Sequence, residues 1–302
     1  MKKDLIQLLD LTQEEIVQIL DLADKMKSEH KQGIPHKVLS GKSLAMIFQK
    51  SSTRTRVSFE VGMYQLGGQA LFLSGSELQI GRGEPIEDTA RVLSRYVDGI
   101  MIRTSSHTEV EDLAKWSSIP VINGLTDFAH PCQALADFMT IREYMGGLKD
   151  VHLAYIGDGN NMCHSLIVGG LKCGMKVSVA VPVGHEPDSK ILDFAKAYPQ
   201  NFMLTHSTQE AAANANVLYT DVWASMGQEA EVEARMKAFN GFCINDELLN
   251  YADSKAIVLH CLPAKRGQEI SAEAFETHAG SIFDEAENRL HAQKAVMALL
   301  MG

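Results

Sequence analysis

The sequence predicts an α/β protein with two doubly wound domains, each with a mainly parallel sheet flanked by helices. Short runs rich in β-branched and aromatic residues alternate with helical segments along most of the chain, which is typical of a parallel sheet. The length of 302 residues suits about two domains. The alternation stops once, near Gly146-Gly147, and then begins again. We therefore expect two similar sheets in one chain.

The first half begins with a helix, because Thr12 and Glu15 form a capping box ahead of apolar residues at helical spacing. Strands are then predicted at Leu44–Phe48, Ala70–Leu73, Gly99–Arg103 and Val121–Leu125. The predicted helices between them are Val57–Leu66, Ile86–Tyr96 and Glu109–Trp116. A longer helix over Gln133–Tyr144 ends at Gly146-Gly147, which marks the expected domain boundary.

The second half repeats this alternation. Its predicted strands are Val151–Ile156, Val177–Val181, Phe202–Leu204, Val217–Val222 and Ile257–Cys261. Its predicted helices are His164–Cys173, Ser189–Ala197 and Glu229–Phe239. A last helix, Glu287–Leu300, is expected to pack back on the first domain. The expected domains are therefore residues 1–146, completed by the helix 287–302, and residues 147–286.

Composition and charge exclude several classes of protein. With 45% hydrophobic and 22% charged residues, the chain resembles an ordinary globular protein. A formal net charge of -10 supplies no general positive field for nucleic acid or for an anionic membrane, so any anionic ligand must be held by a local cluster. No apolar run is long enough to span a bilayer, and Asp4, Gln7 and Asp10 interrupt a signal-peptide pattern. A cytoplasmic protein is expected.

The cysteines do not form a recognisable metal or disulfide pattern. They are five in number and include no C-x-x-C pair, so we expect reduced thiols. An isolated histidine or cysteine is more often a core residue than a catalyst, and this interpretation is preferred for His260, Cys132, Cys163, Cys173 and Cys243. The grouping of polar residues around His130 and Cys261 favours a functional role for these two.

A run of hydroxyl and guanidinium side chains, Ser51–Arg56, lies between a predicted strand and a predicted helix. Free N–H groups at the start of a helix attract anions, and two arginines in the same turn strengthen that attraction. A phosphate site is therefore predicted here. The alternative is that the hydroxyls only cap the helix and the arginines are solvated. A Walker loop is excluded, because G-x-x-x-x-G-K-[ST] is absent.

Gly157-Asp158-Gly159 follows the first strand of the second half but lacks the third glycine of a dinucleotide site, because position 162 is Met162. This argues against a dehydrogenase. The adjacent Asn160-Asn161 offers amide groups where open α/β sheets bind ligands, although the two residues could equally make only a turn.

Three further polar motifs are expected to share one cleft between the domains. His130-Pro-Cys-Gln133 stands at the mouth of the longer helix, while Asp221-Val-Trp-Ala-Ser225-Met226-Gly227 and His260-Cys261-Leu262-Pro263 each end a predicted strand. Gln79–Glu84 is a polar, glycine-rich loop, and Glu287-Asn288-Arg289 by itself indicates only a solvated helix start.

Taken together, these motifs resemble the aspartate/ornithine carbamoyltransferase family. The resemblance depends on Ser52-Thr-Arg-Thr-Arg56, on Arg103 at a strand end and on His130-Pro-Cys-Gln133, and it extends over essentially the whole chain. The Asp221–Gly227 and His260–Pro263 motifs look like the ornithine branch of the family. The resemblance implies transfer of a carbamoyl group from carbamoyl phosphate to the δ-amine of L-ornithine, with no cofactor and no metal.

The resemblance also implies roles for individual residues. Carbamoyl phosphate would contact Ser52, Thr53, Arg54, Thr55, Arg103, His130, Gln133 and Arg289, with main-chain carbonyls from Cys261 and Leu262. Ornithine would be held by Asn161, Asp221, Ser225 and Met226. The residues expected closest to the chemistry are Arg103, His130, Cys261 and Asp221. Gln79 resembles a residue that the family lends to a neighbouring subunit, which implies a homotrimer or a multiple of it.

Two alternatives stay open at this point. The acceptor could be another amine, such as putrescine or a modified ornithine. The chain could also be a catalytically silent homologue that binds these ligands without turnover. A clamp for both the α-ammonium and the carboxylate of an amino acid argues against a plain diamine, which would leave buried polar groups unpaired.

Overall fold

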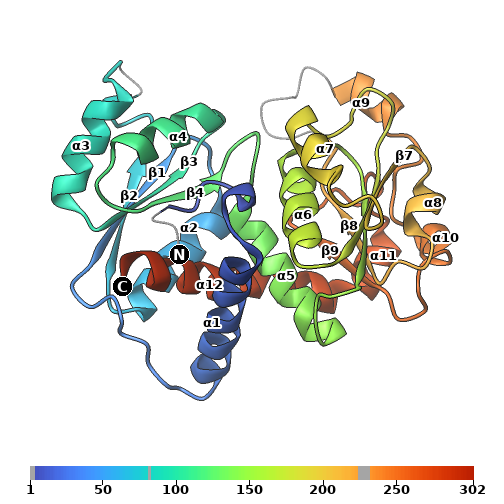
Figure 1. Ribbon diagram of the computed structural model, residues 1–302, viewed down its shortest axis with the longest axis horizontal. Coiled ribbons are helices and arrows are strands. Elements are labelled where there is room, and N and C mark those ends of the chain that lie inside the picture. Colours follow the sequence, from blue (N-terminus) through green and yellow to red (C-terminus); the bar gives the residue numbers. More distant parts are fainter. Residues whose placement is uncertain (1–3, 81–82, 224–231) are drawn as a thin grey trace. The chain divides into compact units, whose positions relative to one another are not determined.

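A computed structural model describes residues 4–80, 83–223 and 232–302 of the chain. These residues form two compact units (Figure 1). The first unit comprises residues up to Met139 together with Glu287–Gly302, and the second comprises Thr140–Ala286. The chain passes from one unit to the other within two helices, α5 (Pro131–Met145) and α12 (Ala279–Met301).

The first unit contains a parallel four-stranded sheet in the order β2-β1-β3-β4. Its strands are β1 (Ser43–Phe48), β2 (Gln69–Ser74), β3 (Gly99–Arg103) and β4 (Val121–Leu125). Its helices before α5 are the short 3-10 helix η1 (Leu8–Asp10), α1 (Gln13–Lys31), α2 (Thr53–Gln65), α3 (Ile86–Tyr96) and α4 (His107–Trp116).

Helices cover both faces of this sheet (Figure 1). On one face, Ala90 of α3 and Val110 and Leu113 of α4 join alternate strand residues in one apolar cluster. On the other face, α2 lies against the C-terminal part of α12. A Cβ placed on Gly62 would come within 2.8 Å of Met297 Cε, so glycine permits the close approach of these two helices. Glycine at position 62 thus allows the two helices to pack closely, although glycine lowers helix propensity.

The second unit contains a parallel five-stranded sheet in the order β7-β6-β5-β8-β9. Its strands are β5 (His152–Ile156), β6 (Lys176–Ala180), β7 (Phe202–Thr205), β8 (Val217–Thr220) and β9 (Ile257–His260). Its helices are α6 (Asn161–Lys172), α7 (Ser189–Ala195), α8 (Thr208–Ala212), α9 (Val232–Ala238), α10 (Asp246–Leu249) and α11 (Ala272–Thr277).

Both sheets have a point where the chain changes its winding direction. In the first sheet β1 and β3 are neighbours, and the helices that follow them, α2 and α4, lie on opposite faces (Figure 1). In the second sheet the corresponding neighbours are β5 and β8, because the strand order runs from β5 to β7 on one side and from β8 to β9 on the other. Ligands of open α/β sheets bind beyond the carboxyl ends of such strands. Each unit therefore has one expected binding edge.

All nine predicted strands are present, with ends that differ by no more than two residues. The largest difference in a helix is the start of α12, which lies at Ala279 rather than at Glu287. The reason is tertiary: the Ser281 hydroxyl donates to the Val258 carbonyl at 2.7 Å, and Ile282 is buried. Three short helices, α8, α10 and α11, were not predicted, because four to six residues carry little helical periodicity. Among the described residues, no helix is both long and apolar enough to cross a membrane.

Candidate functional site

The start of α2 is the first polar centre of the first unit. Ser52 is the N-cap, and its hydroxyl accepts a hydrogen bond from the Thr55 N–H at 3.2 Å. No acidic side chain lies in the first turn, which leaves the positive end of the helix dipole uncompensated there. Because β1 ends at Phe48, this helix start stands at the binding edge of the sheet.

Two arginines of this turn, Arg54 and Arg56, have different surroundings. The Arg56 side chain is exposed, pairs with Glu60 at 3.0 Å, and places its guanidinium 3.7 Å from the centre of the Phe72 ring. Arg54 is half-buried, and its charge acts on His130. The two arginines, which are two positions apart in the sequence, therefore lie in different places: Arg56 on the outer surface and Arg54 at the polar centre.

Arg289 of α12 joins three helices of the first unit through its guanidinium. It donates from Nη1 to Gln133 Oε1 at 2.7 Å and from Nη2 to Thr55 Oγ1 at 3.3 Å. Its Nε donates to Gln293 Oε1 at 2.9 Å. Arg289 is only 3% exposed. A segment that the sequence alone indicated as a solvated helix start thus supplies a buried cation.

Gln133 and His130 approach this cation from the start of α5. Gln133 is 1% exposed and donates from Nε2 to Asp137 Oδ1 at 2.8 Å while its Oε1 accepts from Arg289. Burial, followed by the charges of Arg289, Arg103 and Arg54, holds the pKa of His130 well below its usual range. The imidazole is therefore neutral at neutral pH, in a setting where several positive charges act on one point.

Arg103 completes the expected set in the first unit. It is the last residue of β3, is buried, and lies beside Phe48 in the strand register. Ser52, Thr53, Arg54, Thr55, Arg103, His130, Gln133 and Arg289 thus come from α2, β3, α5, α12 and the ends of these elements. Cationic groups, hydroxyls and helix N–H groups in one place suit a phosphate-bearing anion.

Gln79 stands apart from this group. It is exposed in the loop after β2, and its carbonyl accepts from the Glu84 N–H at 3.0 Å. Within the described residues of the chain, its side chain has no hydrogen-bond partner.

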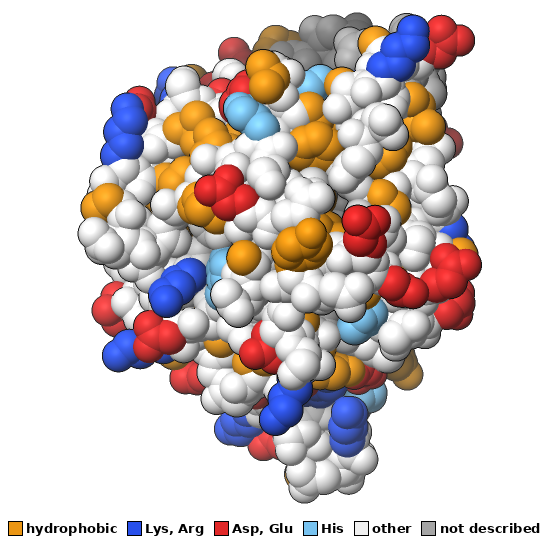
Figure 2. Space-filling model, turned by 90° about the vertical axis from the view of Figure 1, so that its right-hand side faces the viewer, with side chains coloured by type: hydrophobic (Ala, Val, Ile, Leu, Met, Phe, Trp, Pro, Cys, Tyr) orange, Lys and Arg blue, Asp and Glu red, His pale blue; other side chains and the backbone are white. Residues whose placement is uncertain are grey.

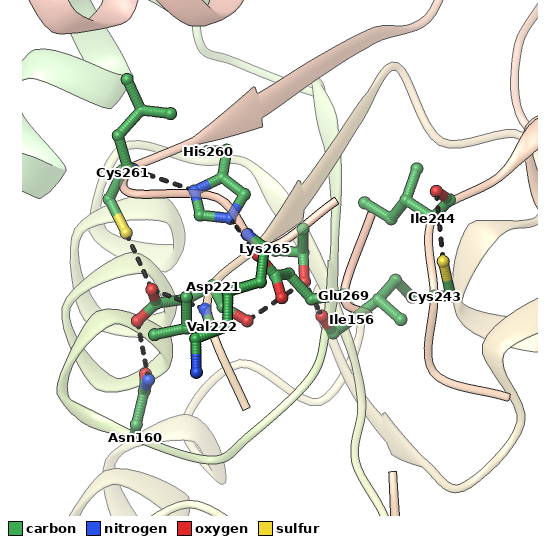
Figure 3. Close-up of polar contacts among 12 residues, drawn as sticks. Ile156, Asn160, Asp221, Val222, Cys243, Ile244, His260, Cys261, Lys265 and Glu269 are labelled. Carbon is green, nitrogen blue, oxygen red and sulfur yellow. Dashed lines mark hydrogen bonds and ion pairs between the residues drawn. The ribbon is translucent and has the colours of Figure 1, made fainter. Parts of the chain in front are cut away.

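In the second unit, Asp221 follows β8 and is held from three directions (Figure 3). Its Oδ2 accepts from Asn160 Nδ2 at 2.8 Å. Its Oδ1 accepts from the Val222 N–H at 2.8 Å and from the Cys261 thiol at 3.1 Å. These contacts fix a buried carboxylate at the edge where β5 and β8 end.

Asn160, and not its neighbour Asn161, makes the hydrogen bond to Asp221. It is the N-cap of α6, with Oδ1 accepting from the N–H groups of Met162 and Cys163. Its amide therefore joins the helix start to Asp221. Asn161 is the first residue of α6 and is half-buried. The Asn-Asn pair was the available signal, but only the strand order shows which of the two meets Asp221.

Arg235 of α9 is a second residue that the sequence did not single out. Its Nη1 donates to Asp158 Oδ2 at 2.7 Å and to the Trp223 carbonyl at 2.8 Å. Burial raises the pKa of Asp158, and the charge of Arg235 opposes that effect. The pair thereby holds the main chain two residues beyond Asp221. Ser225 and Met226 lie outside the described residues.

The strand end at β9 carries Cys261 and Leu262. Leu262 has a left-handed backbone conformation, with a φ of 57°, and a cis peptide bond joins it to Pro263. Its N–H donates to His260 Nδ1 at 2.9 Å. His260 is buried and hydrogen-bonded, as a core histidine should be.

Of the other four cysteines, Cys132, Cys163 and Cys173 are buried as core residues should be, whereas Cys243 is only half-buried. Burial raises the pKa of the Cys132 thiol to about 12 and that of Cys173 to about 11. Burial also raises the pKa of Cys163 well above its usual range, and that of Cys243 to about 11. All five cysteines are free thiols.

Charges of both signs share the face of the molecule that Figure 2 draws. In Figure 2, acidic and basic side chains are interspersed over one face of the molecule. The net charge of -10 still predicts that an anion must be attracted by a local cluster.

Comparison with known proteins supports the two-part organisation. Residues 3–143 match the family model described as aspartate/ornithine carbamoyltransferase, carbamoyl-P binding domain, and residues 149–300 match the one described as the Asp/Orn binding domain. The chain is 55% identical to the ornithine carbamoyltransferase of Carboxydothermus hydrogenoformans, over 99% of this chain and 98% of that protein.

Solved structures give the same result. The ornithine carbamoyltransferase from Pyrococcus furiosus matches with a TM-score of 0.94 at 54% identity, covering 99% of this chain and 97% of that one. The enzyme of the same name from Thermus thermophilus matches with a TM-score of 0.91 at 42% identity, covering all of both chains.

Proposed function

The chain belongs to the aspartate/ornithine carbamoyltransferase family, and we propose that it transfers the carbamoyl group of carbamoyl phosphate to the δ-amine of L-ornithine. The products are L-citrulline and inorganic phosphate. In this reaction the neutral amine nitrogen forms a bond to the carbonyl carbon, the bond from that carbon to the phosphate oxygen breaks, and the amine loses a proton, which the departing phosphate finally takes up.

The observation that carries the proposal is the placement of Arg289. Its guanidinium is fixed by Gln133 and Thr55, in a group of residues that also holds the start of α2, Arg103 and His130. These are the residues expected to bind carbamoyl phosphate. In our proposal Ser52, Thr53, Arg54 and Thr55 bind the phosphate group with the N–H groups of the helix start, and Arg289 adds a further positive charge.

Arg103, Thr55 and His130 are proposed to stabilise the oxygen that becomes negative in the tetrahedral intermediate. A neutral His130 suits this role, because it donates a hydrogen bond without losing its proton to the departing phosphate. One well-placed donor of this kind contributes about 3–4 kcal/mol to the transition state.

The carbamoyl NH2 group needs acceptors, and carbonyl oxygens supply them. We assign this role to Gln133 Oε1 and to the main-chain carbonyls of Cys261 and Leu262. A simple phosphate ester has no such donor. The acceptors therefore favour carbamoyl phosphate over other phosphorylated ligands.

The second unit is proposed to bind ornithine. Asp221 and Ser225 receive the α-ammonium group, and Asn161 with the Met226 N–H receives the carboxylate. Support for the first of these roles is the buried Asp221 carboxylate, which Asn160, Val222 and Cys261 hold in place. We also assign Asp221 and Cys261 to the neighbourhood of the attacking amine, where they assist its deprotonation.

We further propose a homo-oligomer, a trimer or a multiple of it, in which Gln79 serves the site of a neighbouring subunit. An exposed apolar patch on the first unit supports this proposal. It consists of Val57, Val61 and Tyr64, which share one face of α2, and of Leu71 and Phe72 on the edge strand β2. A cytoplasmic location is proposed as well, because the free thiols suit a reducing compartment.

One assay tests the central proposal. Purified protein is given carbamoyl phosphate with ornithine, putrescine or aspartate, and the carbamoylated product is measured. We expect citrulline from ornithine at a rate that far exceeds the rates with the other two amines. Preference for putrescine would assign the chain to another amine, and no product with any of the three would make it a silent homologue.

A further inference from the structure

His260 connects the end of β9 to the segment that follows it through both of its ring nitrogens. Nδ1 accepts a hydrogen bond from the Leu262 N–H at 2.9 Å, and Nε2 lies 3.0 Å from Glu269 Oε1 (Figure 3). Its own main-chain N–H donates to Glu285 Oε2 at 2.8 Å. His260 is 1% exposed, and Glu269 and Glu285 are completely buried. The ring is therefore fixed on every polar atom.

These contacts determine which ring nitrogen carries the proton. A backbone N–H only donates, so Nδ1 must be unprotonated to accept from Leu262. The proton is then on Nε2, where Glu269 accepts it. Glu269 is itself held by the Lys265 N–H, which donates to the same oxygen at 2.5 Å. The carboxylate thus selects the one tautomer that can bind the Leu262 N–H.

The Leu262 N–H belongs to a main-chain segment with an unusual conformation. Leucine rarely adopts a positive φ, because its Cβ then crowds the backbone, yet Leu262 has a φ of 57°. Such a conformation persists only where the surroundings impose it. The bond to His260 Nδ1 is a side-chain contact that restrains this main chain directly.

We infer that His260, oriented by Glu269, is a positioning residue that aims the main-chain carbonyls of Cys261 and Leu262 at the carbamoyl NH2 group. This inference rests on the proposed function, because it takes from it the role of the two carbonyls. It adds that substrate recognition depends on one histidine tautomer in a side chain that contacts no substrate. A histidine that only filled the core would have no such effect.

Two substitutions separate the two contacts of the ring. In His260→Asn, Oδ1 stands near the place of Nδ1, so the acceptor for Leu262 is kept, while Glu269 loses the imidazole donor and keeps the Lys265 N–H. In His260→Gln, the amide reaches toward the place of Nε2, so Glu269 keeps a donor and the Leu262 N–H loses its acceptor. If His260 only filled the core, His260→Gln should be the less damaging variant in every assay, because removing a donor from a buried carboxylate is the more costly defect.

The measurement compares the affinities for carbamoyl phosphate and for inorganic phosphate, which has no NH2 group. We expect His260→Gln to lose at least about tenfold of the preference for carbamoyl phosphate, which is the effect of one misplaced hydrogen-bond pair. His260→Asn should stay within about threefold of wild type, although it unfolds more readily than His260→Gln. Affinity for inorganic phosphate should change less than about twofold in both variants.

A control in the same unit is His152, which contacts Ser178 Oγ at the opposite end of the sheet. His152→Asn and His152→Gln should leave the preference unchanged. The ¹⁵N shifts of the labelled wild-type protein report the tautomer directly, and we expect an unprotonated Nδ1 in His260. A protonated Nδ1, or a preference lost in the asparagine variant and kept in the glutamine variant, overturns the inference. A wild-type protein that forms no citrulline instead contradicts the proposed function.

Discussion

Replacing Arg289 by lysine keeps the positive charge of the first unit and removes the planar group that joins three of its helices. The Nη1, Nη2 and Nε atoms donate to acceptors on α5, α2 and α12 respectively. A lysine ammonium is a single point on a flexible stem, so it cannot occupy three such places. The variant therefore tests whether geometry, rather than charge, makes this centre bind the anion.

The size of the effect follows from the number of bonds lost. We take two of the three bonds as lost, and buried hydrogen bonds to a charged donor contribute roughly 1.5–3 kcal/mol each. The free energy of unfolding should therefore fall by about 3–6 kcal/mol. Misplacing one contact to the ligand costs at least about 1.4 kcal/mol, which corresponds to a tenfold loss of affinity for carbamoyl phosphate.

The matched control is Arg56→Lys, on the exposed side of α2. Among the described residues, Arg56 pairs with Glu60 and stacks on Phe72, and exposed ion pairs contribute about 0–1 kcal/mol. We expect the control to change the KM for carbamoyl phosphate by less than about threefold.

The assay records initial rates of citrulline formation over a range of carbamoyl phosphate concentrations, at saturating ornithine. Inhibition by inorganic phosphate is measured in parallel, because the phosphate group alone should also bind less well to Arg289→Lys. A variant with the KM and the phosphate inhibition constant of the wild type would refute the placement of the ligand beside Arg289.

Four further results are expected. Asp221→Asn should lower kcat/KM for ornithine by about 10- to 100-fold more than for putrescine, because both amines lose its help in deprotonation but only ornithine loses a charged hydrogen bond to its α-ammonium; an equal effect on both amines contradicts the clamp. The pKa of His130 in the folded protein is held below its value in the unfolded chain, which is about 6.5. Protonation of this histidine therefore does not affect the free energy of unfolding above about pH 6.5, and it lowers that free energy as the pH falls from there through the folded-state pKa. His130→Gln should therefore lose less stability than wild type between pH 7.5 and 5.5 in urea unfolding. Gly62→Ala should stay within about 1 kcal/mol of wild type, because the end of the Met297 side chain can shift, while Gly62→Leu should cost about 1–3 kcal/mol in thermal unfolding. Mixing subunits defective in Arg54 with subunits defective in Gln79 should restore part of the activity, and no recovery after reassembly argues against shared sites.

Local signals were strong enough to predict most of the fold. The capping box of Thr12 and Glu15 is present as expected, and its two hydrogen bonds form between residues three apart. Strand ends were predicted well because each strand is a short apolar run bounded by polar or turn residues. The start of α12 was missed because its first eight residues are held by contacts with β9 and β8, which lie far away in the sequence.

The candidate residues of the first unit show the same division. Ser52 and Arg54 are recognisable from the sequence, because a helix start with hydroxyl and guanidinium groups is a local pattern. Arg289 is not, since its acceptors Gln133 and Thr55 are 156 and 234 residues away along the chain. Only the resemblance to the family pointed to Arg289, because nothing local in the sequence marks it as a ligand residue.

By itself, the sequence determined the alternation of strands and helices, the division into two sheets, and the motifs that identify the family. Those features depend on local propensity and on residue order, which the chain carries without folding. The tertiary structure alone decided that Asn160 meets Asp221, that Arg56 faces outward while Arg54 acts on His130, and that His260 holds Leu262. Strand order and helix packing bring these partners together. Both depend on the burial of whole faces of sheets and helices, so no local signal in the sequence shows the contacts.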